Sequence, residues 1–323
     1  MIPAEPAVLV AALLLDLALG DPRWLPHPVI LIGRLINILD TTLCRITSHK
    51  RSAGILLLLI TAGSAGAAAW VLIWGCRYIH PLACFLASAC ISYTCLAARS
   101  LHRESALVAD ALAAGNIAEA RRRLSYIVGR DTTDLDESEI WRALIETVAE
   151  NTSDGIIAPL FWLTVTGPVG GMVYKAVSTL DSMVGYCSER YLQFGWASAR
   201  MDDLLNFIPA RLTALLMILA APLAGLSPQG ALSVVLRDRL KHPSPNSGHP
   251  EAAAAGALGV RLGGPARYRG VASWKEYIGT PLAPLDERAY AGMLKLMYLT
   301  TLLMAAACIA GAFALGGTLA PHL

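Results

Sequence analysis

Long apolar runs, separated by polar stretches, dominate the pattern along this chain. The apolar runs cover residues 6–20, 54–74, 81–98, 156–174, 204–226 and 294–319. A helix needs about 20 apolar residues to cross the hydrocarbon core of a bilayer. The pattern therefore predicts an all-α fold, a polytopic membrane helical bundle with five or six hydrophobic segments and helical polar loops.

The run 156–174 differs from the others because it contains several helix-breaking residues, namely Pro159, Gly167, Pro168, Gly170 and Gly171. Irregular backbone inside a membrane is tolerated only against protein or a water-filled cavity. We expect this segment to be broken at mid-depth. It either spans the membrane or re-enters on the same side, and the sequence leaves both alternatives open.

The polar stretches complete the predicted organisation, which is a single integral membrane domain over residues 1–323. Residues 99–155 are expected to form a polar helical insertion, and residues 228–293 a polar loop with a capped helix. Basic residues in 21–53 and 228–293 favour the cytoplasmic side for both loops. A topology of six spans places both loops in the cytoplasm but puts residues 175–203 on the outer side. The side of the membrane on which residues 175–203 lie therefore stays open.

Composition supports the membrane class. Apolar residues make up 55% of the chain and charged residues 15%, against about 25% charged residues in soluble domains. These values exclude a disordered chain, a coiled coil and a disulfide scaffold. The formal net charge of +2 supplies no field for nucleic-acid binding. The chain also lacks a P-loop, a Rossmann fingerprint and a zinc-protease motif.

Acidic residues recur at helical spacing in the insertion. Glu139, Glu146, Glu150 and Asp154, together with Arg142, follow one another at steps of three or four residues, and Asn151 lies beside them. Such spacing places side chains on one face of a helix, here one that starts at Asp136 or Ser138 and runs toward the membrane. A solvated face and a site for Mg²⁺ or a cationic substrate are about equally favoured, since unneutralised carboxylates beside an apolar segment are costly.

A second group of charged residues follows the broken segment. It consists of Lys175, Asp181, Arg200, Asp202 and Asp203, interleaved with aromatic residues. Aromatic residues and long basic side chains often anchor a protein at the membrane interface. The group is therefore either an interfacial anchor, part of a polar site, or a mixture of the two.

The sharpest local pattern covers residues 242–251, which read HPSPNSGHPE and precede an alanine-rich run. Proline, asparagine and glycine predict a turn, Ser247 or a close neighbour suits the N-cap of a helix, and the alanines propagate that helix. Backbone amides at a helix start bind phosphate well. Two interpretations remain, an ordinary capped helix or a phosphate site. In the second, the participating residues are His242, Ser244, Asn246, Ser247, Gly248, Arg261 and Arg267.

The first span is followed by a turn rich in proline and glycine, at residues 20–28. Such a composition does not continue a helix. Asp21, Arg23 and His27 in this turn serve either a site or the local structure, with equal weight.

Four blocks of the chain, taken together, resemble the adenosylcobinamide-phosphate synthase family of cobalamin biosynthesis, whose members are multi-pass membrane proteins. They are GDPRWLPHPVILIGRLI at 20–36, the segment 129–162 that begins GRDTTDLDESEIW, the segment 174–216 that begins YKAVSTLDSMVGY, and HPSPNSGHPEAAAAGALGVRLGG at 242–264. The resemblance covers most of the chain in order.

The resemblance implies an ATP-dependent and Mg²⁺-dependent ligase. Its expected reaction joins adenosylcobyric acid to (R)-1-aminopropan-2-yl phosphate, or to ethanolamine phosphate, and gives adenosylcobinamide phosphate. ATP is expected as a co-substrate and the corrinoid as a substrate. A location in the inner cell membrane with cytoplasmic active-site loops is also expected, as are lipid contacts. Other membrane proteins of cobalamin assembly are candidate partners, an oligomer is compatible with the sequence, and no nucleic acid is expected.

On this interpretation the site residues fall into three groups. The catalytic group is Glu150, Asp154, Asp181, Asp202 and His27. The metal group is Glu146, Glu150, Asn151, Asp154 and Asp203. The group that binds substrate or phosphate is Asp21, Arg23, Lys175, Arg200, His242, Ser244, Asn246, Ser247, Gly248, Arg261 and Arg267.

Two other classes of function compete with the ligase. A transporter of a corrinoid or another anionic solute would use the broken segment and intramembrane charge to line a path. Internal repeats would favour transport, and the sequence shows none. A membrane scaffold ranks last, because it does not require clustered carboxylates next to a helix start of the phosphate-binding type.

Overall fold

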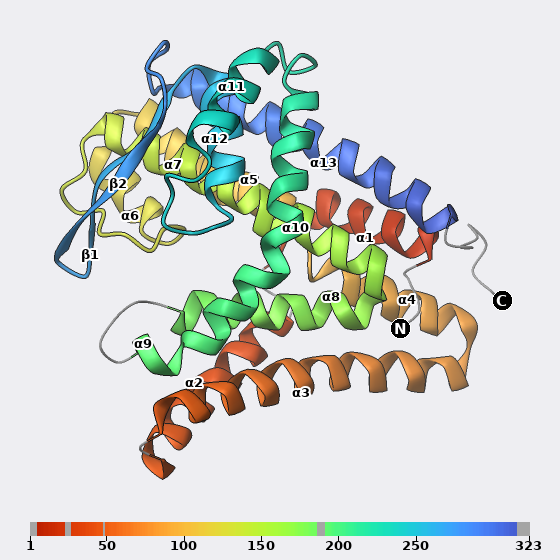
Figure 1. Ribbon diagram of the computed structural model, residues 1–323. Helices are drawn as coiled ribbons and strands as arrows, with labels where there is room; N and C mark the ends of the chain where they lie inside the picture. Colours follow the sequence, from red (N-terminus) through yellow and green to blue (C-terminus); the bar gives the residue numbers. More distant parts are fainter. Residues whose placement is uncertain (1–4, 23–26, 48, 186–190, 315–323) are drawn as a thin grey trace. The chain divides into compact units, whose positions relative to one another are not determined.

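The computed structural model describes residues 5–22, 27–47, 49–185 and 191–314, which are almost entirely helical with one two-stranded sheet (Figure 1). The chain divides into two compact units. The first comprises residues 1–97, 158–206 and 305–323, and the second comprises residues 98–157 and 207–304. The range 98–157 nearly coincides with the predicted polar insertion, and the predicted loop 228–293 lies wholly within the second unit.

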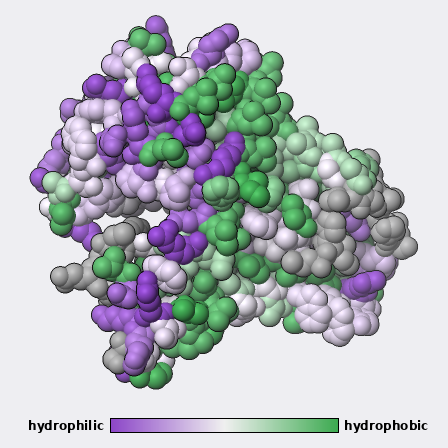
Figure 2. All heavy atoms as spheres, viewed as in Figure 1, coloured by the Kyte–Doolittle hydropathy of each residue, from purple (hydrophilic) through white to green (hydrophobic). Residues whose placement is uncertain are grey.

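Among the described residues, five helical segments are long and apolar enough to cross a membrane, which confirms the prediction of a helical polytopic membrane protein. They are Lys50–Ile79, Pro81–Ala113, Glu137–Val184, Trp196–Ala220 and Glu287–Ala314, and the helix Pro6–Leu19 is apolar but shorter. Large apolar side chains such as Leu59, Trp70 and Leu72 are exposed along the first of these segments. Figure 2 shows hydrophobic residues over wide areas of the surface, as expected for a protein that contacts lipid.

The first unit contains the N-terminal helices and the helix after the insertion. Its elements are α1 (Pro6–Leu19), α2 (Pro28–Ile46), α3 (Lys50–Ile79), α4 (Pro81–Tyr93), α8 (Ala158–Val184), α9 (Tyr191–Phe194) and the first part of α10 (Trp196–Ala220). The long helix α3 packs against α4 and α8, and α1 packs against α4. Small residues permit these contacts, since a Cβ atom on Gly66 of α3 would lie 2.8 Å from Val173 of α8.

The predicted break in the fourth apolar run is confirmed. Within α8, Gly167 has a φ of 72° and Pro168 follows it, so two helical pieces meet at a kink. A positive φ strains any residue with a side chain, whereas glycine adopts it freely. The predicted loop 21–53 holds a helix, α2, which sequence patterning did not separate from its polar surroundings.

The second unit is built around a buried helix. Its helices are α5 (Ala98–Ala113), α6 (Ile117–Leu124), α7 (Glu137–Thr152), the π-helical turn η1 (Ser153–Ile157), the last part of α10, α11 (Pro228–Asp238), α12 (Gly248–Leu258) and most of α13 (Glu287–Ala314). Asp136 caps α7 and forms a reciprocal capping box with Glu139, at the predicted helix start. From Ile140 to Ala149 every side chain of α7 is buried. Of the acids in the stripe, Glu146 is buried and the others are half-buried, so the stripe is not a fully solvated face.

A β-hairpin, which the sequence pattern did not predict, follows α12. Strands β1 (Arg261–Tyr268) and β2 (Val271–Gly279) pair antiparallel, and Tyr268 lies opposite Val271. Arg269 and Gly270 between them both have positive φ, as a tight two-residue hairpin turn requires. The carboxylate of Asp131 accepts hydrogen bonds from the backbone N–H groups of both turn residues, at 3.1 and 2.7 Å.

Helices α11 and α12 pack so closely that two glycines meet at their crossing. A Cβ atom on Gly256 would lie 2.2 Å from the carbonyl oxygen of Gly230, which is far below a van der Waals contact. Only the absence of both side chains permits this approach. The glycine contact holds the end of α12 against the start of α11, so the two helices run side by side.

Replacing Gly256 with alanine is expected to destabilise the protein by about 1–3 kcal/mol, the usual cost of overpacking a filled interior. Thermal unfolding of the detergent-solubilised protein measures the effect. Gly63→Ala on α3 is the matched control, because a Cβ atom there would meet nothing within 4 Å. Equal unfolding temperatures for the two variants would contradict the close packing of α11 and α12.

Candidate functional site

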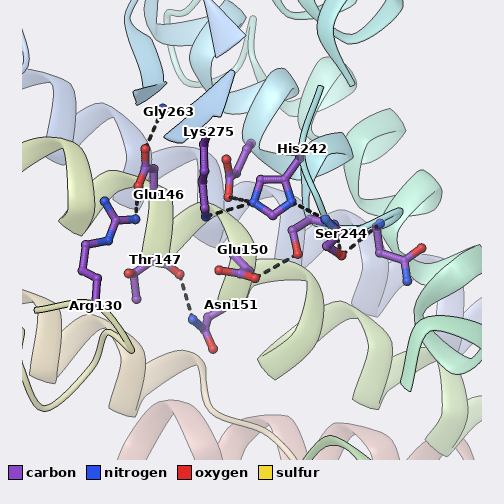
Figure 3. A network of polar contacts seen from close by, with 12 residues as sticks. Arg130, Glu146, Thr147, Glu150, Asn151, His242, Ser244, Gly263 and Lys275 are labelled. Atoms are coloured by element: carbon purple, nitrogen blue, oxygen red, sulfur yellow. Dashed lines mark hydrogen bonds and ion pairs between the residues drawn. The ribbon is translucent and has the colours of Figure 1, made fainter. Parts of the chain in front are cut away.

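Charged side chains from distant parts of the sequence meet inside the second unit (Figure 3). They come from α7, from the segment before it, from the turn between α11 and α12, from α12 itself and from β2. We call this group the buried charge cluster, and it consists of Arg130, Glu146, Glu150, His242, Glu251 and Lys275.

Arg130 and Glu146 form the first part of the cluster. The guanidinium of Arg130 is paired with the carboxylate of Glu146, and both side chains are less than a tenth exposed, at 8% and 3%. The other oxygen of Glu146 accepts a hydrogen bond of 2.7 Å from the backbone N–H of Gly263 on β1. Burial opposes the charge of Arg130, but the carboxylate of Glu146 outweighs it and raises the Arg130 pKa. Both oxygens of Glu146 are thus engaged.

Glu150 lies on α7, one helical turn after Glu146, and its side chain is close to the start of α12. Its Oε1 accepts a hydrogen bond of 2.9 Å from the Ser247 hydroxyl. Ser247 occupies the N-cap position of α12, but its side chain makes no capping bond to that helix. Figure 3 shows Asn151 beside Glu150, with its amide donating to the Thr147 carbonyl oxygen at 2.9 Å. The predicted helix start and the predicted acidic stripe therefore meet.

His242 connects the turn to the remaining charges. Its Nδ1 accepts a hydrogen bond of 3.0 Å from the backbone N–H of Ser244. A neutral imidazole that accepts at Nδ1 carries its proton on Nε2. That nitrogen lies 3.1 Å from the Lys275 Nζ and 3.5 Å from Oε1 of Glu251. Burial and the neighbouring charge of Lys275 lower the His242 pKa to about 4, so the ring is neutral at pH 7.

Glu251 is the least satisfied member of the cluster. Its side chain is 1% exposed, and neither carboxylate oxygen has a hydrogen-bond partner among the described residues. Burial raises its pKa well above the usual range, Glu146 and Glu150 raise it further, and Lys275 opposes them. A buried carboxyl group without partners is costly, so this position calls for a proton or for a cationic ligand.

The charges of the cluster do not balance. Glu146, Glu150 and Glu251 supply three carboxylates, whereas Arg130 and Lys275 supply the only permanent cations among the described residues of this group. Lys275 stays charged, because burial lowers its pKa but the surrounding carboxylates, Glu251 first, raise it by more. One negative charge is left when all carboxylates are ionised. The cluster is therefore neutral either with one further proton, which the raised pKa of Glu251 favours, or with one further positive group bound beside the ionised carboxylates.

The carboxylates do not form a typical metal site. Among the described residues, no group of three or more histidine, cysteine, aspartate or glutamate side chains is arranged to hold a metal ion. Glu146 is engaged by Arg130 and by a backbone amide. Asp154 lies half-buried on the π-helical turn η1. A resident ion held by the predicted metal group therefore does not fit this arrangement.

The predicted phosphate turn is present and well ordered by its own side chains. The hydroxyl oxygen of Ser244 accepts hydrogen bonds from the backbone N–H groups of Asn246 and Ser247, at 3.2 and 3.3 Å. Asn246 accepts a bond of 3.0 Å from Arg211 on α10. Gly248 is the first residue of α12. This geometry confirms the predicted turn and helix start.

The two arginines expected to clamp a phosphate have other partners. Arg267 of β1 is paired with Asp134 at 3.2 Å, and both side chains are more than half exposed. Arg261 lies over the ring of Tyr277, 4.1 Å from its centroid. The hairpin, unforeseen from sequence, carries both arginines and Tyr277, whereas Asp134 comes from the segment before α7. Arginines nearer the turn are described below.

The remaining predicted residues belong to the first unit. His27 Nδ1 accepts from the backbone N–H of Val29 at 3.3 Å and so caps α2, while its Nε2 lies 3.3 Å from Asp21. These contacts give both residues a structural role, and the catalytic role predicted for His27 and the substrate-binding role predicted for Asp21 stay predictions. Arg23 lies outside the described residues.

The second group of charged residues, which follows the break in the fourth apolar run, is also in the first unit. Arg200 lies 3.7 Å from Asp203, and Asp202 accepts a bond of 2.9 Å from Asn206. Lys175 and Asp181 are half-buried on α8. The catalytic, metal-binding and substrate-binding roles predicted for this group stay predictions.

Sequence reasoning missed three members of the cluster, Arg130, Glu251 and Lys275. Glu251 carried a usable signal, since a single acid at the head of a helix of alanine and glycine predicts a buried charge. No signal in the sequence indicated Lys275, because it lies among polar and aromatic residues of β2. Its inward position depends on the pairing of the hairpin.

Acidification is expected to destabilise the protein through two buried histidines. Burial and the charge of Arg211 lower the His249 pKa to about 4, as burial and Lys275 do for His242. Both values lie below the ordinary 6.5, so the neutral rings contribute stability above pH 6.5 that is lost as the pH falls toward 4. The raised pKa of Glu251 has the opposite effect on stability, because protonation of this buried carboxyl group stabilises the folded protein as the pH falls.

Thermal unfolding in detergent between pH 7 and pH 4 tests this expectation. His249→Asn removes one titrating ring and isolates its share, so the unfolding temperature should fall less with acidification in this variant than in the parent protein. An identical pH dependence of the two proteins would rule out a titrating role for His249.

Comparison with known proteins gives consistent matches along the chain. The sequence model of the family described as "CobD/Cbib protein" matches residues 9–297. A protein of Pelobacter propionicus named "Cobalamin biosynthesis protein CobD" is 66% identical over 317 residues, which are 98% of each chain. Proteins of the same name are 60% identical in Geobacter metallireducens, over 90% of this chain and 92% of the relative, and 45% identical in Klebsiella pneumoniae over the same shares. No solved structure matches the chain.

Proposed function

This chain belongs to the CobD/Cbib family of cobalamin biosynthesis proteins, and on that premise we propose that it is an ATP-dependent amide-forming ligase. The proposed acid is adenosylcobyric acid. The proposed amine is (R)-1-aminopropan-2-yl phosphate or ethanolamine phosphate, and the product is adenosylcobinamide phosphate. The names of the relatives state the pathway and not this reaction, so the reaction is our proposal.

The observation that carries the proposal is the unbalanced charge around Glu251. The proposed amine has one ammonium group and one phosphate group, a short distance apart. The buried charge cluster lacks one positive charge, and it adjoins the start of α12, where backbone amides favour an anion. Ser247 links the two features, because it sits at that helix start and donates to Glu150 at 2.9 Å. A single small zwitterion would supply a positive group to the cluster and a negative group to the start of α12.

The chemistry requires activation of the acid. A carboxylate oxygen of the corrinoid attacks the γ-phosphorus of ATP, ADP leaves, and an acyl phosphate forms. The amine nitrogen then attacks the acyl carbon, the carbon–oxygen bond to the phosphate breaks, and inorganic phosphate departs. The ammonium must lose two protons overall, one before attack and one as the amide forms, and a nearby group has to accept the first.

The cluster offers one suitable acceptor for that proton. His242, with a pKa of about 4, is a weak base at pH 7. The carboxylate of Glu251 has a raised pKa and is therefore the better match for an ammonium donor. We assign proton acceptance to Glu251, whose Oε1 lies 3.5 Å from Nε2 of His242.

Mg²⁺ enters this proposal only with ATP. Glu146 is already engaged by Arg130 and by a backbone amide, and Mg²⁺ bound to ATP takes most of its ligands from phosphates and water. We propose Mg-ATP as a co-substrate and route no step through a protein-bound metal. The inner cell membrane and a cytoplasmic position of the active-site loops are parts of the same proposal, as are contacts with other membrane proteins of cobalamin assembly.

An assay with the purified protein in detergent tests the proposal. Adenosylcobyric acid, Mg-ATP and aminopropanol phosphate are supplied, and the corrinoid mass and ATP consumption are followed together. We expect a product heavier by the amine minus water that does not form without ATP. A folded sample that binds the corrinoid but forms no amide in the presence of all substrates would contradict the ligase.

The kink in α8 favours a second candidate, a transporter of a corrinoid or another anionic solute. Gly167 and Pro168 interrupt an apolar helix, as discontinuous helices do in transporters. Uptake into sealed vesicles is the discriminating measurement. Transport without amide formation would replace the ligase proposal.

A further inference from the structure

We propose that Arg211, Arg239 and His249, together with the start of α12, form a binding site for a phosphate monoester. The proposal rests on the ligase function in one respect, because it takes the phosphate of the amino alcohol as the occupant. The chemistry of the site is also that of an ATP phosphate, and the experiment below separates the two sources. All of these residues lie in the second unit.

The end of α11 touches the start of α12. A Cβ atom on Gly248 would lie 2.3 Å from the carbonyl oxygen of Arg239 and 2.8 Å from Cβ of His242. Glycine is therefore required at the first position of α12. This close approach brings the backbone of Arg239 beside the helix terminus, whose partial positive charge attracts anions.

Arg211 lies on another helix, α10, and contacts the turn before α12. Its Nη1 donates to Oδ1 of Asn246 at 3.0 Å, and its Nη2 lies 3.5 Å from the carbonyl oxygen of Pro245. The guanidinium also lies over the ring of Phe207, 3.6 Å from its centroid. These contacts orient Arg211 toward the residues that precede α12.

Neither arginine has a carboxylate partner among the described residues. Arg239 donates to the carbonyl oxygens of Val235 and Leu236, at 3.2 and 2.8 Å. Arg211 donates to carbonyl and amide oxygens alone. Arg211 also lies in α10, a candidate membrane-spanning segment, where an uncompensated charge is expensive and marks a functional position by default. Two positive charges therefore lack a counter-ion.

His249 supplies an independent observation. It is the second residue of α12 and is 4% exposed, and its Nδ1 has no hydrogen-bond partner among the described residues. The charges of both arginines act on its ring, since Arg211 and Arg239 each lower its pKa in addition to the effect of burial. A buried polar atom without a hydrogen-bond partner among the described residues, near two guanidiniums that have no carboxylate partner there, is explained by a ligand that accepts and donates hydrogen bonds.

A phosphate monoester fits these features better than other anions. It carries up to two negative charges, which match the two guanidiniums, and arginine binds phosphate oxygens in a bidentate manner. The backbone N–H groups of Asn246, Ser247 and His249 already have partners, so the start of α12 attracts the phosphate through its helix dipole and the guanidiniums supply the hydrogen bonds. When protonated, a phosphate hydroxyl also donates to a neutral imidazole nitrogen. The buried charge cluster reaches the same turn through Ser247 and Glu150, so the ammonium and the phosphate of one amino alcohol phosphate have separate places.

Ligand-induced thermal stabilisation of the full chain in detergent tests the site without requiring turnover. The probes are aminopropanol phosphate, Mg-ATP and aminopropanol without phosphate. The variants are Arg211→Gln and Arg239→Gln, and Arg122→Gln is the matched control, because Arg122 is an exposed residue of α6 paired with Glu119 at 2.6 Å. The use of two variants keeps the test decisive if one of them fails to fold.

We expect aminopropanol phosphate to stabilise the parent protein and Arg122→Gln equally. In each site variant its apparent Kd should rise by about ten- to a hundredfold, as for the loss of one charged hydrogen bond. Binding of Mg-ATP should be unchanged. If Mg-ATP binding weakens instead, the same site is confirmed with an ATP phosphate as its occupant. If both phosphate ligands bind the site variants as tightly as the parent, the proposal is overturned.

The same data separate this inference from the ligase proposal. Phosphate-dependent stabilisation that needs Arg211 and Arg239, in a protein that forms no amide, would leave the anion site standing and remove the ligase. Amide formation with normal substrate affinities in both variants would leave the ligase standing and remove the anion site.

Discussion

Replacing Glu150 with glutamine is expected to reduce amide formation by about 10²–10³-fold, a magnitude typical for the loss of one preorganised polar group in an active site. Glutamine retains the size of glutamate, and its Oε1 still accepts from the Ser247 hydroxyl, which lies 2.9 Å from Glu150 in the parent protein. The substitution therefore removes only the charge. The cluster then holds no surplus negative charge, and the ammonium of the amine loses its counter-ion.

The amide-forming assay at saturating Mg-ATP and corrinoid measures this effect, with the amine concentration varied. Glu137→Gln is the matched control, since Glu137 is exposed on the same helix and outside the cluster. We expect the control to keep its activity, and the purified Glu150→Gln protein to keep its unfolding temperature. Full activity of Glu150→Gln would exclude a role for this carboxylate in the reaction.

Replacing Arg130 with methionine is expected to destabilise the protein by about 3–5 kcal/mol, the usual cost of breaking a buried ion pair from one side. Methionine fills much of the space but leaves the carboxylate of Glu146 without its cation. Glu146 is 2% exposed, so water does not replace the lost partner. The single hydrogen bond from Gly263 remains, at 2.7 Å, and does not neutralise the charge.

The double variant Arg130→Met, Glu146→Gln is the control for this prediction. Removing the stranded charge should restore part of the lost stability, because the neutral amide of glutamine still accepts from Gly263. Thermal or denaturant unfolding of the single and double variants in detergent gives the coupling between the two positions. If the double variant is less stable than Arg130→Met, the pair does not act as a unit.

Two parts of the buried charge cluster have different functions in this proposal. Arg130 and Glu146 neutralise one another, and their pairing orders the segment before α7 against β1. Glu150 and Glu251 lie toward the start of α12 and retain the unbalanced charge. A mutation in the first pair is therefore expected to act through stability, and a mutation in the second through catalysis. Unfolding and activity measured on the same samples distinguish the two.

Several local features were predictable because their causes are local. The capping box at Asp136 and Glu139, the kink at Gly167 and the turn before α12 each depend on residues within a few positions of one another. Apolar runs of membrane-spanning length predicted the helical class without any tertiary information. The resemblance of long blocks to one family was also available from the residue order, and the family comparison confirms it.

The partners of the charged residues were not predictable in this way. Glu150 meets Ser247 across 97 residues, and Glu146 meets Gly263 across 117, and no helical or turn periodicity relates such positions. The β-hairpin has a weak local pattern, yet its pairing sets Lys275 against His242 and gives Arg267 a partner in Asp134. An arginine that looks like a phosphate clamp in sequence is thereby engaged elsewhere.

The sequence by itself thus determined the membrane class, the position of most helices, the acidic stripe, the helix start and the family. Only the tertiary structure decided that Glu146 of the stripe is buried and neutralised by Arg130, and that neither oxygen of Glu251 has a hydrogen-bond partner among the described residues. The physical reason is that hydrophobicity and backbone geometry act over a few residues. The balance of buried charge instead depends on which distant side chains the fold brings into the same low-dielectric interior.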